Sequence, residues 1–312
     1  LRRQRQMCIR DSKKRGMILM KNAKRFTAII LSALMAASVF SAVTVSAKTL
    51  DGEVTAVSED LKNDDYMYII LDDGTVEIKT YMGDASEVII PNTIDGKKVT
   101  SIGDEAFYEN KNLEKITIPD SVTNIGNAAF SGTAWYENQP DGMVFLGKVL
   151  YAYKGIMSGN TNIVIPDGTV SISKNAFCGY LGLTKVTIPS SLKKIGEYAF
   201  GSCSSLRNIT FSNGLTDIGD KAFYDCYGLT DITLPESVTS IGNNAFEGCS
   251  RLKNIVIPDN VIIIGDAAFC NCENLSEITI PNNITNIGKE AFLGTAWYNN
   301  CLLYTSDAAD EG

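Results

Sequence analysis

The sequence of 312 residues carries 28 Lys and Arg against 36 Asp and Glu, which gives a formal net charge of −8. It contains no histidine, and this excludes Ser-His-Asp and Cys-His mechanisms and histidine-ligated metal centres within the chain. The acidic balance argues against nucleic acid and anionic lipid as partners, because both require a basic footprint.

Both ends of the chain have the character of foreign sequence. One stretch of DNA can encode residues 2–12 (RRQRQMCIRDS) on one strand and residues 301–310 (CLLYTSDAAD) on the other, and this DNA resembles an adapter used in sequencing libraries. We therefore interpret residues 1–19 as translated adapter and untranslated leader, with the start at Met20, and residues 301–312 as an adapter-derived tail. The chain is then a gene fragment. The alternative is a basic arm for nucleic acid and an acidic tail.

Residues 20–47 have the pattern of a secretory signal peptide. Basic residues precede an apolar run at 26–45, and a small-x-small sequence ends at Ala47. We expect cleavage between Ala47 and Lys48, which predicts a secreted protein without a membrane span; a retained anchor is the alternative. Without both ends the chain keeps 18 basic and 32 acidic residues, a net charge of −14.

Residues 48–91 are expected to form an N-terminal β cap. Asp73-Gly74 lies between two runs of alternating apolar residues, which is a hairpin signal, and Asp95-Gly96 begins another turn. A cap of this kind covers the open end of a repeat array, where an uncovered edge would invite aggregation.

Residues 92–300 repeat one pattern with a period of 23 residues. The motif Ile-Gly-x-x-Ala-Phe, or a close variant, ends at Phe107, Phe130, Phe177, Phe200, Phe223, Phe246, Phe269 and Phe292. The single wide gap, of 47 residues before Phe177, predicts a degenerate copy within it, next to an irregular insert at 132–162. Such a period indicates a solenoid. One unit cannot bury its own Leu, Ile and Phe side chains, but stacked units can, so we expect one continuous core.

Each repeat divides into two halves. The half L-x-x-I-x-I-P, as at residues 113–119, predicts a short β-strand with one buried face that the proline closes; Ser212 replaces this proline in one copy. The other half, I-G-x-x-A-F, predicts a helical or 3₁₀ turn in which Gly supplies a sharp corner and Ala permits close approach of the backbone.

The strand pattern, with Cys three residues before the Leu, is typical of leucine-rich repeats. More narrowly, I-P-x-x-[VIL]-x-x-I-G-x-x-A-F with a 23-residue period resembles the BspA-like family of bacterial surface proteins, from about Tyr66 to Asn300. The resemblance implies a leucine-rich-repeat solenoid with a strand and a short helix or 3₁₀ turn per coil. It also implies a role in adhesion or host-protein binding.

Four cysteines share one column of the repeat, Cys203, Cys226, Cys249 and Cys272, and Asn110 holds the same position in the first copy. We expect buried free thiols that cap backbone groups, with disulfides and metal ligation as alternatives. Cys270 and Cys272 make only a weak metal motif. The paired acids lie in turns and indicate solvated loops, so we predict no catalytic, cofactor or metal site.

The outward residues of the predicted strands are the candidate binding face. They are Lys115, Thr117, Lys185, Thr187, Asn208, Thr210, Asp231, Thr233, Asn254, Val256, Glu277 and Thr279. Stacked about 4.8 Å apart, they form a flat surface suited to a protein partner, such as a host matrix protein, a host surface protein or the surface of another cell. Alternatively, Thr occupies these positions for β-propensity alone. Trp135 and Tyr136 are a second candidate, as an aromatic platform for sugar or peptide, unless their rings fill the core.

We therefore expect a secreted or cell-surface adhesion module. If it is held at the cell surface, we expect the attachment to lie in a region beyond residue 300. Two alternatives remain open at this point: the docking arm of a larger secreted enzyme whose catalytic domain lies beyond residue 300, and a structural spacer of the envelope.

Overall fold

The structure is a computed structural model that describes residues 49–50, 53–54 and 60–300. The expected leader (1–19), signal peptide (20–47), cleavage site at Ala47 and Lys48, and tail (301–312) lie outside the described residues. The antiparallel pair β1 (Thr49–Leu50) and β2 (Glu53–Val54) belongs to one compact unit. The cap and the repeats belong to the other unit, Asp60–Tyr298.

An N-terminal β cap begins the second unit, as predicted. It contains β3 (Leu61–Lys62) and the antiparallel hairpin of β4 (Tyr66–Ile70) and β5 (Val76–Tyr81). The turn of this hairpin includes Gly74, whose φ of +80° suits glycine. A second hairpin joins β7 (Thr93–Ile94) to β8 (Lys97–Ile102) through Asp95-Gly96. Because β5 also pairs with β8 in parallel, the cap leads directly into the parallel stacking of the coils.

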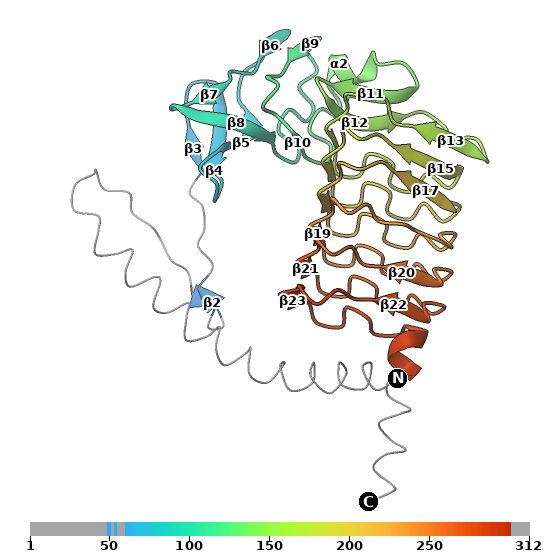
Figure 1. Ribbon diagram of the computed structural model, residues 1–312. Coiled ribbons are helices and arrows are strands. Elements are labelled where there is room, and N and C mark those ends of the chain that lie inside the picture. Colours follow the sequence, from blue (N-terminus) through green and yellow to red (C-terminus); the bar gives the residue numbers. More distant parts are fainter. Residues whose placement is uncertain (1–48, 51–52, 55–59, 301–312) are drawn as a thin grey trace, which may run out of the picture. The chain divides into compact units, whose positions relative to one another are not determined.

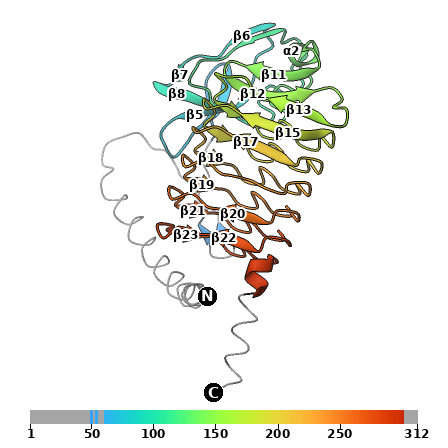
Figure 2. The ribbon, with the colours of Figure 1, turned by 45° about the vertical axis from the view of Figure 1, so that its right-hand side comes forward.

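Most coils contribute short strands to two parallel sets. The inner set is β8, β10 (Asn124–Ile125), β12 (Val149–Lys154), β14 (Ser171–Ile172), β16 (Lys194–Ile195), β18 (Asp217–Ile218), β19 (Ser240–Ile241), β21 (Ile263–Ile264) and β23 (Asn286–Ile287). The outer set is β6 (Glu87–Ile89), β9 (Lys115–Thr117), β13 (Thr161–Val164), β15 (Leu183–Ile188), β17 (Asn208–Phe211), β20 (Asn254–Val256) and β22 (Glu277–Thr279). Figures 1 and 2 show the two sets on opposite sides of the stacked coils. The predicted leucine-rich-repeat solenoid is confirmed.

The turn half of the repeat differs from the predicted helical or 3₁₀ turn. The second x of I-G-x-x-A-F has a left-handed backbone in every copy, at Glu105, Ala128, Asn175, Tyr198, Lys221, Asn244, Ala267 and Glu290. A left-handed residue cannot continue a right-handed helix. Every second N–H then points at the next coil: the N–H groups of Tyr198 and Phe200 donate to the carbonyls of Asp220 and Ala222 at 3.0 and 2.9 Å. These turns therefore add a third ladder of hydrogen bonds between coils.

The glycine of the I-G-x-x-A-F motif has a different role from the predicted one. Gly242 and Gly265 do not have positive φ. A Cβ on Gly242 would lie 2.6 Å from the backbone nitrogen of Asp220, and one on Gly265 would lie 2.5 Å from that of Asn243. The glycine therefore permits the close approach of successive coils, and the residue two positions further along makes the corner.

The buried residues form two cores instead of the single core expected. The cap-side core runs from Tyr66 to Tyr151, and the repeat core runs from Leu150 to Phe292. Stacked phenylalanines form the axis of the repeat core, with ring centroids 5.2 Å apart for Phe177 and Phe200 and 5.5 Å for Phe269 and Phe292. The two cores meet at β12, inside the irregular insert.

The insert contains the degenerate copy that the spacing predicted. It consists of α2 (Ala134–Glu137), β11 (Gly142–Leu146) and β12, and β12 pairs with β14 as the inner strand of the missing coil. Tyr153 takes the phenylalanine position, with its ring 5.9 Å from that of Phe177. The N–H of Phe130 meets no carbonyl of the next coil and donates to the Tyr151 hydroxyl at 3.0 Å. The hydrogen-bond ladder is thus interrupted here, and a side chain replaces the lost acceptor.

Candidate binding surfaces

The outer strands bring most of the predicted binding-face residues into two columns. Lys185, Asn208, Asp231, Asn254 and Glu277 are register partners of one another, through strands or isolated bridges. The second column contains Thr187, Thr210, Thr233, Val256 and Thr279. All are exposed except Thr187, which is half-buried. Among the described residues, none of the first column makes a side-chain hydrogen bond or an ion pair.

The same columns include residues that the sequence analysis missed. Asn162 and Val164 on β13 pair with Lys185 and Thr187, and Val164 is 65% exposed. Their distance of 23 residues from β15 could have revealed them, but the insert obscures the period there. On the cap side, Glu87 pairs with Lys115, with 3.7 Å between Lys115 Nζ and Glu87 Oε2. This pair is 28 residues apart, so the repeat period gives no indication of it.

The candidate face is not the single sheet expected. Strands β6 and β9, which carry Lys115 and Thr117, form a two-stranded sheet of their own. Strands β13, β15 and β17 form a second sheet, and β20 and β22 a third. Isolated bridges at Asp231 link the last two. Between β9 and β13 the chain forms no outer strand; it forms β10, α2 and the hairpin of β11 with the inner strand β12. The larger continuous surface therefore extends from Asn162 to Thr279, and we call it the outer ladder.

Trp135 and Tyr136 lie against the cap-side core. The Trp135 ring is 5.3 Å from that of Phe130, and the Tyr136 ring is 5.7 Å from that of Tyr151, both edge-on. Lys154 Nζ holds the end of α2, donating to the carbonyls of Tyr136 and Gln139 at 3.2 and 2.9 Å. Both rings are half-buried, so the structure favours the packing role over the aromatic platform.

The cysteine column lies inside the coils. Each thiol donates to the carbonyl of a phenylalanine in the preceding coil, as from Cys203 to Phe177 at 2.9 Å and from Cys226 to Phe200 at 3.1 Å. Asn110 does the same through its amide, donating to the carbonyl of Gly83 at 3.2 Å. All six cysteines of the described region are free. Burial raises the pKa of Cys203 to about 12, so its thiol is inert near neutral pH.

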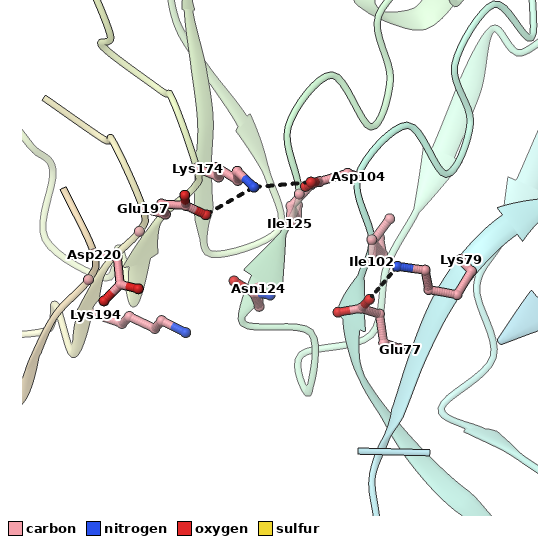
Figure 3. A pocket seen from close by; sticks show the side chains of 14 residues that line it. Glu77, Lys79, Ile102, Asp104, Asn124, Ile125, Lys174, Lys194, Glu197 and Asp220 are labelled. Atoms are coloured by element: carbon pink, nitrogen blue, oxygen red, sulfur yellow. Dashed lines mark hydrogen bonds and ion pairs between the residues drawn. The ribbon is translucent and has the colours of Figure 1, made fainter. Parts of the chain in front are cut away.

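A polar hollow opens on the inner side, where the two cores meet. It encloses about 450 Å³, and Figure 3 shows its walls: Glu77, Lys79 and Asn124 on one side, Lys194 and Asp220 on the other. We call it the inner hollow. No pattern in the sequence indicates it, because its two walls come from distant parts of the chain on either side of the insert.

Lys174 connects the two sides of the inner hollow. Its ammonium lies 3.0 Å from a carboxylate oxygen of Asp104 and 3.0 Å from one of Glu197. Burial by itself would lower the pKa of Lys174, but the hydrogen bonds to the two carboxylates outweigh it and raise this pKa. Burial by itself would raise the pKa of Asp104. The hydrogen bonds from the Asn127 N–H and from Lys174 outweigh burial and bring this pKa below its usual range.

Neither a metal centre nor a membrane-spanning helix is found in the described region. In residues 60–300 and the two short strands before them, no three His, Cys, Asp or Glu side chains converge as metal ligands. Over the same part of the chain, no helix is both long and apolar enough to cross a membrane.

The fold and its repeat define a leucine-rich-repeat solenoid protein. Residues 72–138 and 170–299, more than half of the chain, match the BspA type leucine rich repeat region in six copies. The chain therefore belongs to the BspA-type leucine-rich repeat family.

Several solved structures are similar to this chain. A leucine-rich repeat protein of T. pallidum is 27% identical, with 77% of this chain and 90% of that chain covered and a TM-score of 0.34. One from Bacteroides ovatus is 23% identical, with 76% and 92% covered and a TM-score of 0.44. The pneumococcal vaccine antigen PcpA is 17% identical, with 78% and 98% covered and a TM-score of 0.43. A comparison with curated proteins finds no match.

Proposed function

We propose that the protein is a secreted or cell-surface adhesion module that binds a partner protein through the outer ladder. The observation that carries this proposal is the pair of exposed columns held in register on the outer strands. Family membership supports it, because the BspA-type resemblance implies a role in adhesion. Export rests on the signal pattern of residues 20–47, so the mature protein is expected to begin at Lys48.

The geometry of the outer ladder suits protein recognition. The side chains project from strands that are fixed by backbone ladders and by the core beneath them. Contacts made by such a surface lose little conformational entropy on binding. In the first column Lys185, Asp231 and Glu277 alternate with asparagines, which gives charges of both signs and amide hydrogen-bonding groups. This composition fits a polar protein surface better than a uniformly charged polymer.

The test is a triple variant, Lys185→Ala, Asn208→Ala and Asp231→Ala, which leaves the net charge unchanged. Binding of the exported protein to a panel of immobilised extracellular-matrix proteins is measured by surface plasmon resonance. We expect at least a tenfold loss of affinity for the protein that the unmodified chain binds. The thermal midpoint should hardly change, because exposed substitutions shift stability by only about 0.5 kcal/mol each.

The matched control replaces exposed residues away from the outer strands, Asp259→Ala, Asn282→Ala and Lys289→Ala, with the same change in charge. It should bind as the unmodified protein does. Full binding by the first triple variant would remove the outer ladder from consideration. N-terminal sequencing of exported protein tests the other part of the proposal, which a mature chain still carrying residues 26–45 would refute.

A further inference from the structure

Lys194 in the inner hollow forms no ion pair within the described region. Three acids lie close to it in sequence, in register or on the same wall of the hollow, and each makes a hydrogen bond or an ion pair with another group. Asp217, its register partner on β18, accepts from the Ser240 hydroxyl at 2.9 Å. Glu197 is paired with Lys174. Asp220 accepts from the backbone N–H of Asn243 at 2.7 Å. The Lys194 ammonium therefore enters the hollow without an ion-pair partner among the described residues.

The opposite wall is polar and fixed in position. Glu77 accepts from the Ser101 hydroxyl at 2.9 Å and lies 3.1 Å from Lys79 Nζ. The Asn124 amide donates to the same hydroxyl at 2.9 Å. Figure 3 shows Lys194 facing this wall across open space. A ligand in the hollow thus meets the unpaired Lys194 ammonium on one side, and on the other the Glu77–Lys79 ion pair with the Asn124 amide.

We propose that the inner hollow is a second docking site, which takes an acidic side chain from an extended segment of a partner protein, with Lys194 as its anchor. The Lys194 ammonium would bind the carboxylate of the incoming Asp or Glu. A neighbouring Lys or Arg of the same segment would approach Glu77 and share its carboxylate with Lys79. The site lies on the inner side, away from the outer ladder, so it does not depend on the function proposed for that surface.

Charge and size favour this occupant over other anions. Four acids and three lysines line the hollow, so a multiply charged phosphate would be repelled, whereas a segment with one carboxylate and one cation complements both walls. A volume of about 450 Å³ lies within the range of about 300–1,000 Å³ that is usual for binding pockets. Because the hollow is partly open to solvent, a continuous chain can enter and leave it.

The test uses the full chain with ¹⁵N-labelled lysine, titrated with the peptide acetyl-Gly-Glu-Lys-Gly-amide and followed by NMR. We expect saturable shifts of the Lys194, Lys174 and Lys79 amides. The peptide acetyl-Gly-Gln-Lys-Gly-amide should bind at least tenfold more weakly, because it lacks the charge-assisted contact. Inorganic phosphate should produce no saturable shift.

Variants test whether the Lys194 ammonium itself anchors the peptide. Lys194→Gln should abolish saturable binding of the Glu peptide without changing the thermal midpoint, since residue 194 is exposed. Lys253→Gln, at another exposed lysine, should bind normally, and so should the outer-ladder triple variant. The proposal is overturned if Lys194→Gln binds normally, if both peptides bind alike, if phosphate binds the hollow more tightly than the peptide, or if the shifts gather on the outer strands.

Discussion

Replacing Phe200 tests whether the phenylalanine stack holds the repeat core together. Its side chain is fully buried, and its ring lies 5.2 Å from that of Phe177 and 5.4 Å from that of Phe223, with interplanar angles of 5° and 1°. Phe200→Ala should reduce the free energy of unfolding by about 3–5 kcal/mol through the cavity it leaves. Phe200→Leu keeps most of the apolar volume and loses two ring contacts of about 0.5–1.5 kcal/mol each, so it should cost about 1–3 kcal/mol.

The two tryptophans allow each core to be followed separately. Trp297 packs on Phe292 in the repeat core, and Trp135 packs against the cap-side core. Denaturant unfolding is followed by fluorescence in the variants Trp135→Phe and Trp297→Phe, each of which keeps one tryptophan. Phe200→Ala should shift the Trp297 transition more than the Trp135 transition, because solenoid units interact mainly with their neighbours. Leu181→Ala, at a 63% exposed side chain, is the control and should change little.

Each of these two claims has its own refuting result. A loss below about 1.5 kcal/mol for Phe200→Ala would mean that the stack contributes far less than a buried aromatic core. Equal shifts of both tryptophan transitions would mean that the two cores unfold as one unit.

Two further predictions concern the cysteine column and the proline position. The buried thiols of Cys203 and Cys226 should react slowly with a maleimide in native protein and completely after denaturation without reductant; labelling that requires reductant would establish disulfides. Because the folded pKa of Cys203 is raised from 9.0 to about 12, its unfolded thiol loses a proton first. The stability it contributes is therefore present below pH 9 and lost as the pH rises towards 12, and Cys203→Ala should flatten this decline; an unchanged decline would contradict it. Ser212→Pro should cost about 1–3 kcal/mol, because the Ser212 N–H donates to the Ile188 carbonyl at 3.1 Å, whereas Ser212→Ala should be nearly neutral. Equal melting of these two variants would show that this hydrogen bond adds nothing.

The coil itself was predictable because its period is regular. Alternating Leu and Ile indicated the outer strands, and the Cys column with Asn110 indicated the buried caps, since both depend on residues at a fixed spacing. The left-handed corner was not predictable. Residues as different as Glu105, Ala128 and Tyr198 occupy it, so no residue type indicates it. The hydrogen bonds between coils impose this conformation against the local preference of those residues.

The outer ladder could be named residue by residue wherever the period holds. The prediction failed at the edges of the insert, where Asn162 and Val164 were missed and where β9 and β13 do not pair. The domain boundaries at 47/48 and 91/92 stay predictions. The inner hollow had no signal in the sequence, because contacts such as that of Lys174 with Asp104 join residues 70 positions apart across the insert.

The insert is what gives this solenoid features that a uniform repeat would lack. In the regular coils before the last one, every phenylalanine N–H donates to the next coil, and the rings stack at similar spacings. At Phe130 the Tyr151 hydroxyl takes over as acceptor, and the insert, with α2 and the hairpin of β11 and β12, contributes no outer strand. The outer surface is divided at this point, while on the inner side the walls of the hollow come together around Lys174. One irregular coil therefore sets the limit of the outer ladder and creates the inner hollow. A deletion that restored the 23-residue period would extend the outer ladder and remove the inner hollow.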